Sequence, residues 1–384
     1  MSSLLRTRAV LLLAALSSTP TLLAAPIAPW NWSTPSYFIH CSNSSGPLSS
    51  PMLSAMAAAS FTVIEKWQCV YCAPNMTGAE SKMVAAARQI RARAQRAPVF
   101  LYWQADWTRT WYSSGVYFDE HPKLELHNAD GTLFVDTSGG ASGGAWHAYD
   151  FANNITVQTW AAHIAATYNA GAFDGVLIDG VEPSHQDFNL SSAAAKKAFD
   201  AGKAQSGVVL AAALPANAHV VANKLPRPLG YTGSMVEFFQ GTNESISKLL
   251  SLPKNTFLEV HSTTRVRPNP WAQTLAAYLV VVEEGMYFGA SSGEKGGWRD
   301  CDGWSDPGLL AQYRKPLGAP KGKATWTDGA NETGFWAREF ESGTNVTLWP
   351  GGKALAAGFQ SGKKVKGRAC VRWADGTTLG SACV

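Results

Sequence analysis

Eight segments of strand character alternate with segments of helical character between residue 36 and about residue 315. This alternation favours a parallel sheet, because each crossover between parallel strands needs about a dozen residues or more and usually contains a helix. Eight such units favour a closed (β/α)8 TIM barrel over an open sheet. The expected strands are 36–41, 61–67, 98–103, 175–179, 219–223, 234–239, 256–262 and 285–290.

Between these strands, apolar residues recur at helical spacing, which predicts helices. A long loop, 108–148, interrupts the pattern, and its Asn128-Ala-Asp-Gly131 sequence predicts a tight hairpin turn. A loop of this length inside a compact domain is usually functional. The expected helices are 51–59, 78–95, 154–169, 191–214 and 270–284.

The pattern changes at about residue 321. Short β-like pieces separated by glycine-rich turns predict a small C-terminal antiparallel β domain at 321–384, which leaves 26–320 for the barrel. The expected pieces are 334–341, 345–349, 354–360 and 369–373.

The first 25 residues have the layout of a secretory signal peptide. Arg6 and Arg8 precede the apolar run Ala9–Leu16, and small residues follow at Ala24 and Ala25. No later segment offers 18 uninterrupted apolar residues, so we expect a secreted protein with no membrane span. Loss of the two arginines lowers the formal charge from +4 to +2, which offers no electrostatic case for nucleic acid.

Glycosylation sequons and cysteines agree with a secretory route. The eight sequons predict N-glycans, and the six cysteines form an even set suited to an oxidising compartment. We expect Cys370 to pair with Cys383, and Cys41 to pair near Cys69 or Cys72, although six cysteines allow 15 pairings. Cys69-X-X-Cys72 is read as a structural bridge rather than a redox or zinc motif. The sequons lie at Asn31, Asn43, Asn75, Asn154, Asn189, Asn243, Asn331 and Asn345.

Acidic residues recur where the expected strands end. The apolar run Gly175–Ile178 reads as a strand buried on both faces, and it ends in Asp179. Strand ends of a barrel converge on one mouth, where a carboxylate pair can protonate a leaving oxygen and attack or activate water. We expect Asp179 and Glu237 to be the catalytic pair, although either could instead be a structural, ion-paired residue.

Further polar and aromatic residues near the expected mouth suit a carbohydrate. Aromatic rings can cover the apolar faces of sugars, and side chains with oxygen or nitrogen atoms can bind hydroxyl groups. The same rings could fill the core, and the same acids could be ion-paired. The expected substrate-binding residues are Glu65, Trp103, Asp106, Trp107, Tyr117, Glu182, Asn223, Glu259 and His261.

The sequence indicates no cofactor and no catalytic metal. Its eight histidines show no His-Glu-X-X-His spacing, which argues against zinc catalysis. The glycine-rich run 139–144 lacks the Gly-Lys-Ser/Thr ending of a phosphate loop, and no Gly-X-Ser-X-Gly elbow is present.

Several short motifs resemble a known family. The run Phe173–Asp179, the run Val220–Asn223 and the Asp150-Phe151 pair before a tryptophan-containing helix resemble secreted glycoside-hydrolase-like TIM barrels related to the endo-α-1,4-polygalactosaminidase group. The runs Tyr313–Gly318 and Trp336–Gly343 resemble the passage into the C-terminal β domain of that family. The resemblance implies glycoside hydrolysis, with an aspartate at strand four and an acid at strand six, which map onto Asp179 and Glu237.

Our leading hypothesis is a secreted glycoside hydrolase that cleaves an extracellular or cell-wall polysaccharide by a two-carboxylate mechanism. The first alternative is a catalytically inactive carbohydrate-binding barrel. The second is a polysaccharide lyase, in which Arg265 or Arg267 would neutralise a uronate.

Overall fold

The structure is a computed structural model of the chain. The expected signal peptide, 1–25, lies outside the described residues, as do the sequons at Asn75, Asn189 and Asn331. In the described part, no helix has the length and apolar character needed to cross a membrane. The described residues are 27, 30–72, 78–93, 97–108, 111–136, 146–181, 190–237, 239, 241–252, 255–261, 271–291, 300–301, 303–328, 334–350 and 367–383.

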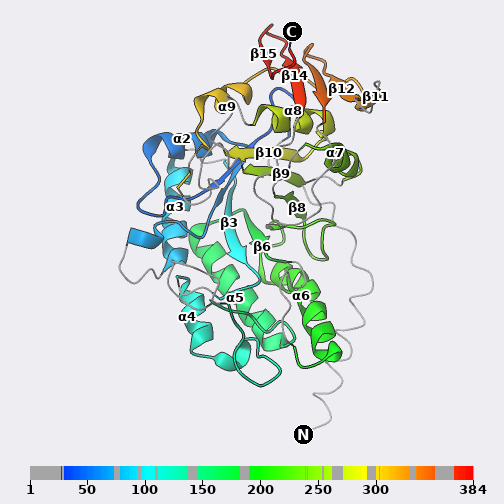
Figure 1. The fold of residues 1–384 in the computed structure, drawn as a ribbon. Helices are drawn as coiled ribbons and strands as arrows, with labels where there is room; N and C mark the ends of the chain where they lie inside the picture. The colour runs from blue at the N-terminus through cyan, green and yellow to red at the C-terminus, as the bar shows by residue number, and fades with distance from the viewer. Residues whose placement is uncertain are drawn as a thin grey trace.

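An eight-stranded parallel sheet forms the centre of the molecule, in the order β1-β2-β3-β6-β7-β8-β9-β10 (Figure 1). The sheet closes on itself where Tyr37, just before β1, pairs in parallel with Phe288 of β10 and the Phe288 N–H donates to the Ser36 carbonyl at 3.1 Å. The expected barrel is therefore confirmed. Its strands are β1 (Phe38–Cys41), β2 (Phe61–Ile64), β3 (Val99–Gln104), β6 (Gly175–Asp179), β7 (His219–Ala222), β8 (Gly233–Val236), β9 (Thr256–His261) and β10 (Met286–Ser291).

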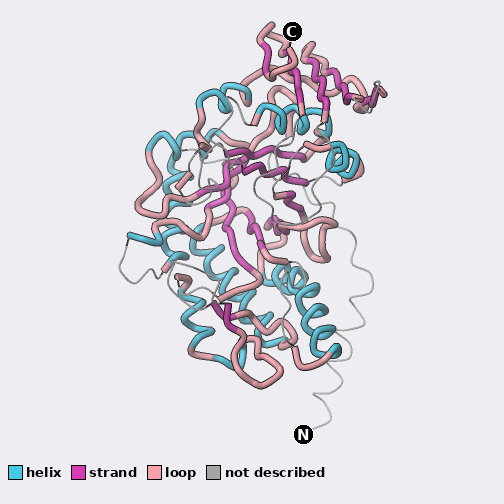
Figure 2. Tube along the Cα trace, in the orientation of Figure 1, coloured by secondary structure: helices cyan, strands magenta, loops and turns pink. Residues whose placement is uncertain are grey.

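Helices surround the strands, as the tube in Figure 2 shows. The five expected helices are all present. The helices α4, α7 and α9 were not expected, because six or seven residues are too few for a helical period to be recognised in the sequence. The helices are α2 (Ser50–Ala58), α3 (Ala79–Arg93), α4 (Ser113–Asp119), α5 (Asn154–Gly171), α6 (Ala193–Ala213), α7 (Asn243–Leu249), α8 (Ala272–Val281) and α9 (Pro307–Gln312), with short 3₁₀ turns η2 (Val70–Cys72) and η3 (Pro122–Leu124).

The described parts of the segment between β3 and α5 contain more secondary structure than the expected loop. Besides α4 and η3 it contains the two-residue strands β4 (Val135–Asp136) and β5 (Trp146–His147), which pair antiparallel. The expected hairpin turn is present, because the Gly131 N–H donates to the Asn128 carbonyl at 3.0 Å. This segment leaves the barrel at the end of β3 and returns to its side before α5 begins.

Aromatic rings fill the interior of the barrel. Phe61 lies at the centre, with its ring centroid 5.0 Å from Phe38, 5.2 Å from Phe100, 4.7 Å from Phe257 and 5.1 Å from Tyr287. Because side chains alternate along a strand, the residues two positions further on point into the same interior. That next layer contains the polar side chains of His40, Tyr102 and Glu259 beside the apolar Val63.

A second, antiparallel sheet packs on α8 at one end of the molecule (Figure 1). The buried Arg338 fastens it by donating to the backbone carbonyls of Val280 and Val282, at 2.9 and 2.6 Å. The strands β11 and β15 were not expected, and the expected strand 354–360 lies outside the described residues. The sheet contains β11 (Thr325–Thr327), β12 (Phe335–Glu339), β13 (Asn345–Trp349), β14 (Arg368–Arg372) and β15 (Thr378–Leu379).

All six cysteines form disulfides: Cys41–Cys301, Cys69–Cys72 and Cys370–Cys383. The expected pair Cys370–Cys383 is confirmed, and Cys69-X-X-Cys72 forms a bridge within itself. The expectation for Cys41 was wrong. Its partner is 260 positions away in the sequence, and barrel closure brings the end of β1 near the segment that follows β10.

Candidate active site

Asp179 and Glu237 meet at a shared hydrogen-bond donor. Asp179 is the last residue of β6, Asn223 follows β7 directly, and Glu237 follows β8 directly. The Asn223 side-chain nitrogen donates to Asp179 Oδ1 at 2.9 Å and to Glu237 Oε2 at 2.6 Å. The two carboxylate oxygens are therefore separated by no more than the total of these distances, about 5.5 Å.

Asp179 has further donors on both carboxylate oxygens. The Gly180 N–H donates to Oδ1 at 2.8 Å, and the Tyr102 hydroxyl donates to Oδ2. Burial by itself raises the pKa of Asp179, but nearby Lys66 and the hydrogen bonds from Tyr102, Asn223 and Gly180 outweigh it, so the pKa is lowered. Asp179 is consequently held as a carboxylate at neutral pH.

The buried ion pair Lys66–Glu65 contacts the Tyr102 hydroxyl that donates to Asp179. Lys66 donates to Glu65 Oε1 at 2.5 Å and to the Tyr102 hydroxyl at 3.0 Å. Glu65 also accepts a hydrogen bond from the Trp67 N–H at 2.9 Å. Burial raises the pKa of Tyr102 well above its ordinary value, and the negative charges of Asp179 and Glu65 raise it further. Tyr102 therefore keeps its hydroxyl proton and donates a hydrogen bond to Asp179. Glu65, which was expected to bind substrate, has Lys66 as its described ion-pair partner.

Asp106 lies beside Asp179, and the position of its carboxylate requires a glycine at position 180. Gly180 has a φ of +68°, and a Cβ atom on it would lie 1.5 Å from Asp106 Oδ1. The Asp106 carboxylate therefore occupies space that any side chain at position 180 would fill. Lys203 of α6, only 4% exposed, lies 3.6 Å from Asp106 Oδ1. Burial lowers the pKa of Lys203, and Asp106 acts against that shift.

Glu259 forms a second buried pair in the same polar layer. Both of its carboxylate oxygens lie within hydrogen-bond distance of His40 Nδ1, at 3.0 and 2.9 Å. The His40 ring lies 5.6 Å from the Tyr102 ring, centroid to centroid. Glu259 is completely buried. Its described contact is with His40, and the His40 ring in turn lies beside Tyr102.

The three expected aromatic residues have other aromatic rings as their described contacts. Trp103 is 1% exposed and packs against Tyr112, because strand alternation turns it outward when Tyr102 points into the barrel. Trp107 is 5% exposed, and its ring stacks on Phe134. Tyr117 is partly exposed on α4, where it stacks on His121 and contacts His163 of α5. Its described contacts thus lie in the outer helical layer.

Other expected residues fall outside the description. Glu182 lies in the segment 182–189, outside the described residues, and Arg265 and Arg267 lie outside them in 262–270. His261 is the last residue of β9, with only its backbone described.

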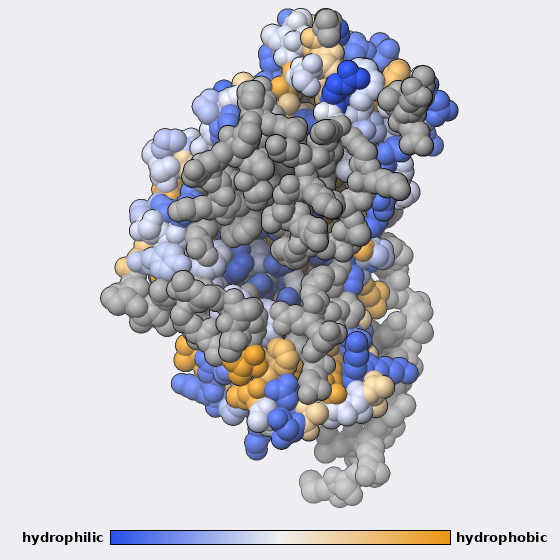
Figure 3. Space-filling model, viewed as in Figure 1, coloured by the Kyte–Doolittle hydropathy of each residue, from blue (hydrophilic) through white to orange (hydrophobic). Residues whose placement is uncertain are grey.

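Sequence reasoning missed Tyr102, Lys66, His40 and Lys203. Strand alternation could have found Tyr102 and His40, since each lies two positions after a phenylalanine that fills the barrel. No local signal marks the role of Lys66 or Lys203, because Tyr102 and Asp106, which they contact in the site, lie far from them in the sequence. In the space-filling view, hydrophilic atoms line a recess at the centre of the face, in the region where Figure 1 labels β3 and β6 (Figure 3).

Similar folds occur among solved glycoside hydrolases. The GH36 α-galactosidase AgaA of Geobacillus stearothermophilus has 10% identity and a TM-score of 0.50, with 88% of this chain and 50% of that chain covered. Ega3 of Aspergillus fumigatus, solved with galactosamine, has 13% identity, a TM-score of 0.43 and coverages of 72% and 96%. The glycoside hydrolase domain of PelA from Pseudomonas aeruginosa has 11% identity, a TM-score of 0.40 and coverages of 68% and 95%.

At such low identity these likenesses concern the fold alone, and the chain spans about half the length of the α-galactosidase. No curated protein matches the sequence significantly. Family membership comes from a family model instead: residues 91–344, more than half of the chain, match the model of hypothetical glycosyl hydrolase family 15. The chain belongs to hypothetical glycosyl hydrolase family 15.

Proposed function

We propose that the protein is a retaining glycoside hydrolase in which Asp179 is the nucleophile and Glu237 is the acid/base. The observation that carries the proposal is the shared donor Asn223, which limits the separation of the nearest carboxylate oxygens to about 5.5 Å. Retaining enzymes separate their two carboxyl groups by about 5–5.5 Å, whereas inverting enzymes leave about 6.5–9.5 Å for a water molecule.

The two environments support different roles. Asp179 is held ionised by Lys66 and three hydrogen bonds, as an attacking carboxylate requires. Glu237 is partly exposed and accepts its described hydrogen bond from Asn223. An acid/base residue must give a proton to the leaving oxygen and then take one from water, so partial exposure suits it.

In the first step, Asp179 attacks the anomeric carbon while Glu237 protonates the departing oxygen. The glycosidic bond breaks and a glycosyl ester forms on Asp179. In the second step Glu237, now ionised, removes a proton from water, and the water oxygen displaces Asp179 from the anomeric carbon. Two inversions give net retention.

The test compares Asp179→Asn and Glu237→Gln with Glu341→Gln, which changes an exposed carboxylate in the turn between β12 and β13. A panel of neutral, acidic and amino-sugar polysaccharides serves as substrate, with released reducing ends as the readout. We expect both site variants to lose at least 1,000-fold in kcat and the control to match wild type. Activity that survives in both site variants would overturn the proposal.

Two further measurements separate the alternatives. Proton NMR of the first product released distinguishes retention from inversion, and inversion would contradict the nucleophile assignment. Glycan binding by wild type without any released sugar would favour the inactive carbohydrate-binding barrel. An unsaturated product that absorbs in the ultraviolet would favour the lyase.

We also propose that the protein is secreted, glycosylated and active on an extracellular polysaccharide. The signal-like residues 1–25, the eight sequons and the three disulfides support this. Recovery of the protein from culture medium, with a shift in mobility after endoglycosidase treatment, is the expected result. Retention of an intact leader inside cells would contradict it.

A further inference from the structure

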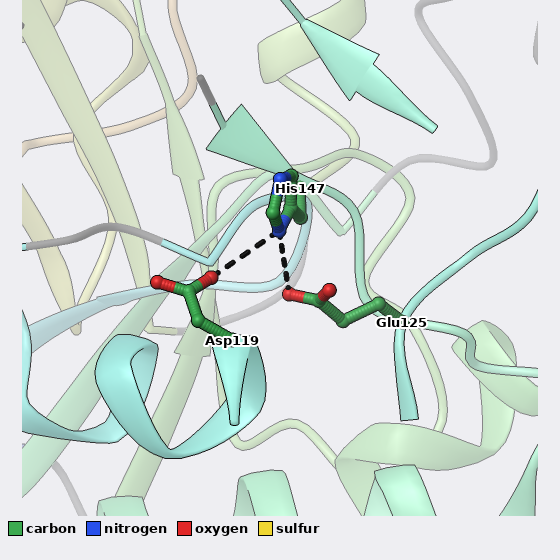
Figure 4. A group of neighbouring side chains, drawn as sticks. All are labelled: Asp119, Glu125 and His147. Carbon is green, nitrogen blue, oxygen red and sulfur yellow. Dashed lines mark hydrogen bonds and ion pairs between the residues drawn. The ribbon is translucent and has the colours of Figure 1, made fainter. Parts of the chain in front are cut away.

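Three side chains of the β3–α5 segment, none of them part of the carboxylate pair, lie close together. Asp119 is the last residue of α4, Glu125 follows η3, and His147 belongs to β5 (Figure 4). His147 Nδ1 lies 3.2 Å from Asp119 Oδ1 and 3.0 Å from Glu125 Oε1. One nitrogen or oxygen atom from each residue lies within 4.8 Å of the other two. The cluster is therefore compact enough to share a single ligand.

Hydrogen bonds alone do not satisfy this cluster. An imidazole Nδ1 carries at most one hydrogen, yet it faces two carboxylates. Glu125 is 0% exposed, and its second oxygen, Oε2, is buried without a hydrogen-bond partner. A buried carboxylate that is not fully paired is costly. The unpartnered oxygen is an observation separate from the clustering, and a bound cation would offset the cost of burying this carboxylate.

The distances between the candidate ligand atoms also fit the coordination shell of a metal ion. Zinc binds imidazole nitrogen and carboxylate oxygen at about 2.0–2.2 Å. Neighbouring ligand atoms in a tetrahedral or octahedral shell of that size are then about 2.9–3.5 Å apart. Both observed nitrogen–oxygen separations fall in this range. Asp119 is 36% exposed at its side chain, so an ion can enter and water can complete its coordination.

We propose that Asp119, Glu125 and His147 form a binding site for one divalent transition-metal ion, with Zn²⁺ the preferred ion. Two carboxylates balance the charge of a divalent cation. The imidazole nitrogen favours Zn²⁺ over Mg²⁺ or Ca²⁺, which prefer shells made of oxygen atoms.

The ion would fasten the long β3–α5 segment rather than take part in glycosidic cleavage. The His147 carbonyl accepts from the Thr108 N–H at 2.7 Å, and the Tyr149 N–H donates to the Asp106 carbonyl at 3.3 Å. A metal bound to His147 therefore stabilises the backbone that adjoins Asp106. The role is structural, and it is independent of the proposed hydrolysis.

The experiment uses the full protein, stripped with a chelator and titrated with ZnCl2 by calorimetry. Asp119→Asn is compared with Glu120→Gln, which changes the adjacent exposed carboxylate outside the cluster. Wild type and Glu120→Gln should bind one more Zn²⁺ per chain than Asp119→Asn, or bind it at least 10-fold more tightly. Melting temperature should rise with Zn²⁺ in the first two proteins only.

His147→Ala provides a second variant, because it removes the nitrogen ligand and leaves both acids in place. It should lose the same binding event. Equal Zn²⁺ stoichiometry and affinity in wild type, Asp119→Asn and His147→Ala would overturn the site. So would a stripped wild-type protein that takes up no Zn²⁺. Tighter binding of Ca²⁺ than of Zn²⁺ would overturn the preference for Zn²⁺.

Discussion

The Tyr102 hydroxyl donates a hydrogen bond to Asp179, and the same hydroxyl accepts one from Lys66. Tyr102 therefore connects the buried Lys66 to the carboxylate of the proposed nucleophile, Asp179, through two hydrogen bonds. The groups that lower the Asp179 pKa come from distant parts of the chain: Lys66 follows β2, Tyr102 lies in β3 and Asn223 follows β7.

Replacement of Tyr102 by phenylalanine removes one of the donors that lower the Asp179 pKa. The pKa should rise toward its ordinary value, so the acidic limb of the kcat/KM profile should move to higher pH. Hydrogen bonds to charged groups are worth about 1.5–3 kcal/mol, or about 10- to 100-fold in rate. A pH–rate profile of Tyr102→Phe measures both effects, and an unmoved limb with full activity would contradict the role.

Gly180→Ala should damage both stability and activity. Position 180 has a φ of +68°, and the new Cβ would overlap the Asp106 carboxylate. Gly131→Ala is the control, since its φ is +85° and nothing lies within 4 Å of the added Cβ. Positive φ alone costs about 1–2 kcal/mol. Urea unfolding should show a clearly larger loss for Gly180→Ala, and equal losses would refute the Asp106 contact.

Glu125 should make the metal-free protein less stable as pH rises. Burial raises its pKa to about 7 from an ordinary 4.5; His147 opposes this shift, and Asp119 adds to it. Between these values the folded chain holds a proton that the unfolded chain has released. Stability therefore falls with rising pH in this window, by up to about 1.4 kcal/mol per pH unit.

The measurement is urea unfolding at several pH values in the presence of a chelator. Glu125→Gln cannot titrate at this position, so its stability should vary less between pH 4.5 and 7. An identical slope in wild type and variant would show that Glu125 is not the group responsible.

The disulfides should differ in their contribution to stability. In the chain-entropy account the stabilisation grows with the length of the loop that the bond closes. Cys41–Cys301 spans 260 positions and Cys69–Cys72 spans three, which corresponds to about 5.6 and about 1.6 kcal/mol. Paired alanine variants compared by chemical unfolding test this order. A larger loss for Cys69→Ala/Cys72→Ala would contradict it.

Predictions from local patterns succeeded where the interaction is itself local. All eight barrel strands and the five long helices were found, because side-chain alternation and helical spacing extend over enough residues to be recognised. The Cys370–Cys383 bridge was also found, since both cysteines lie in one hairpin region. The short helices α4, α7 and α9 were missed for lack of length.

Predictions that needed contacts between distant strands were less complete. Trp103 and Tyr102 are neighbours in the sequence, yet only Tyr102 faces the polar layer. The Asp119–Glu125–His147 cluster was also missed, because its members come from three separate pieces of a segment expected to be a loop.

By itself the sequence determined the barrel, its second sheet and an acid at the end of a central strand, since these follow from the periodicity of neighbouring residues. Only the tertiary structure decided that Asn223 bridges Asp179 and Glu237, that Lys66 acts on Asp179 through Tyr102, and that Cys41 meets Cys301. The physical reason is barrel closure, which brings together side chains and strand ends whose separation in space no local pattern records.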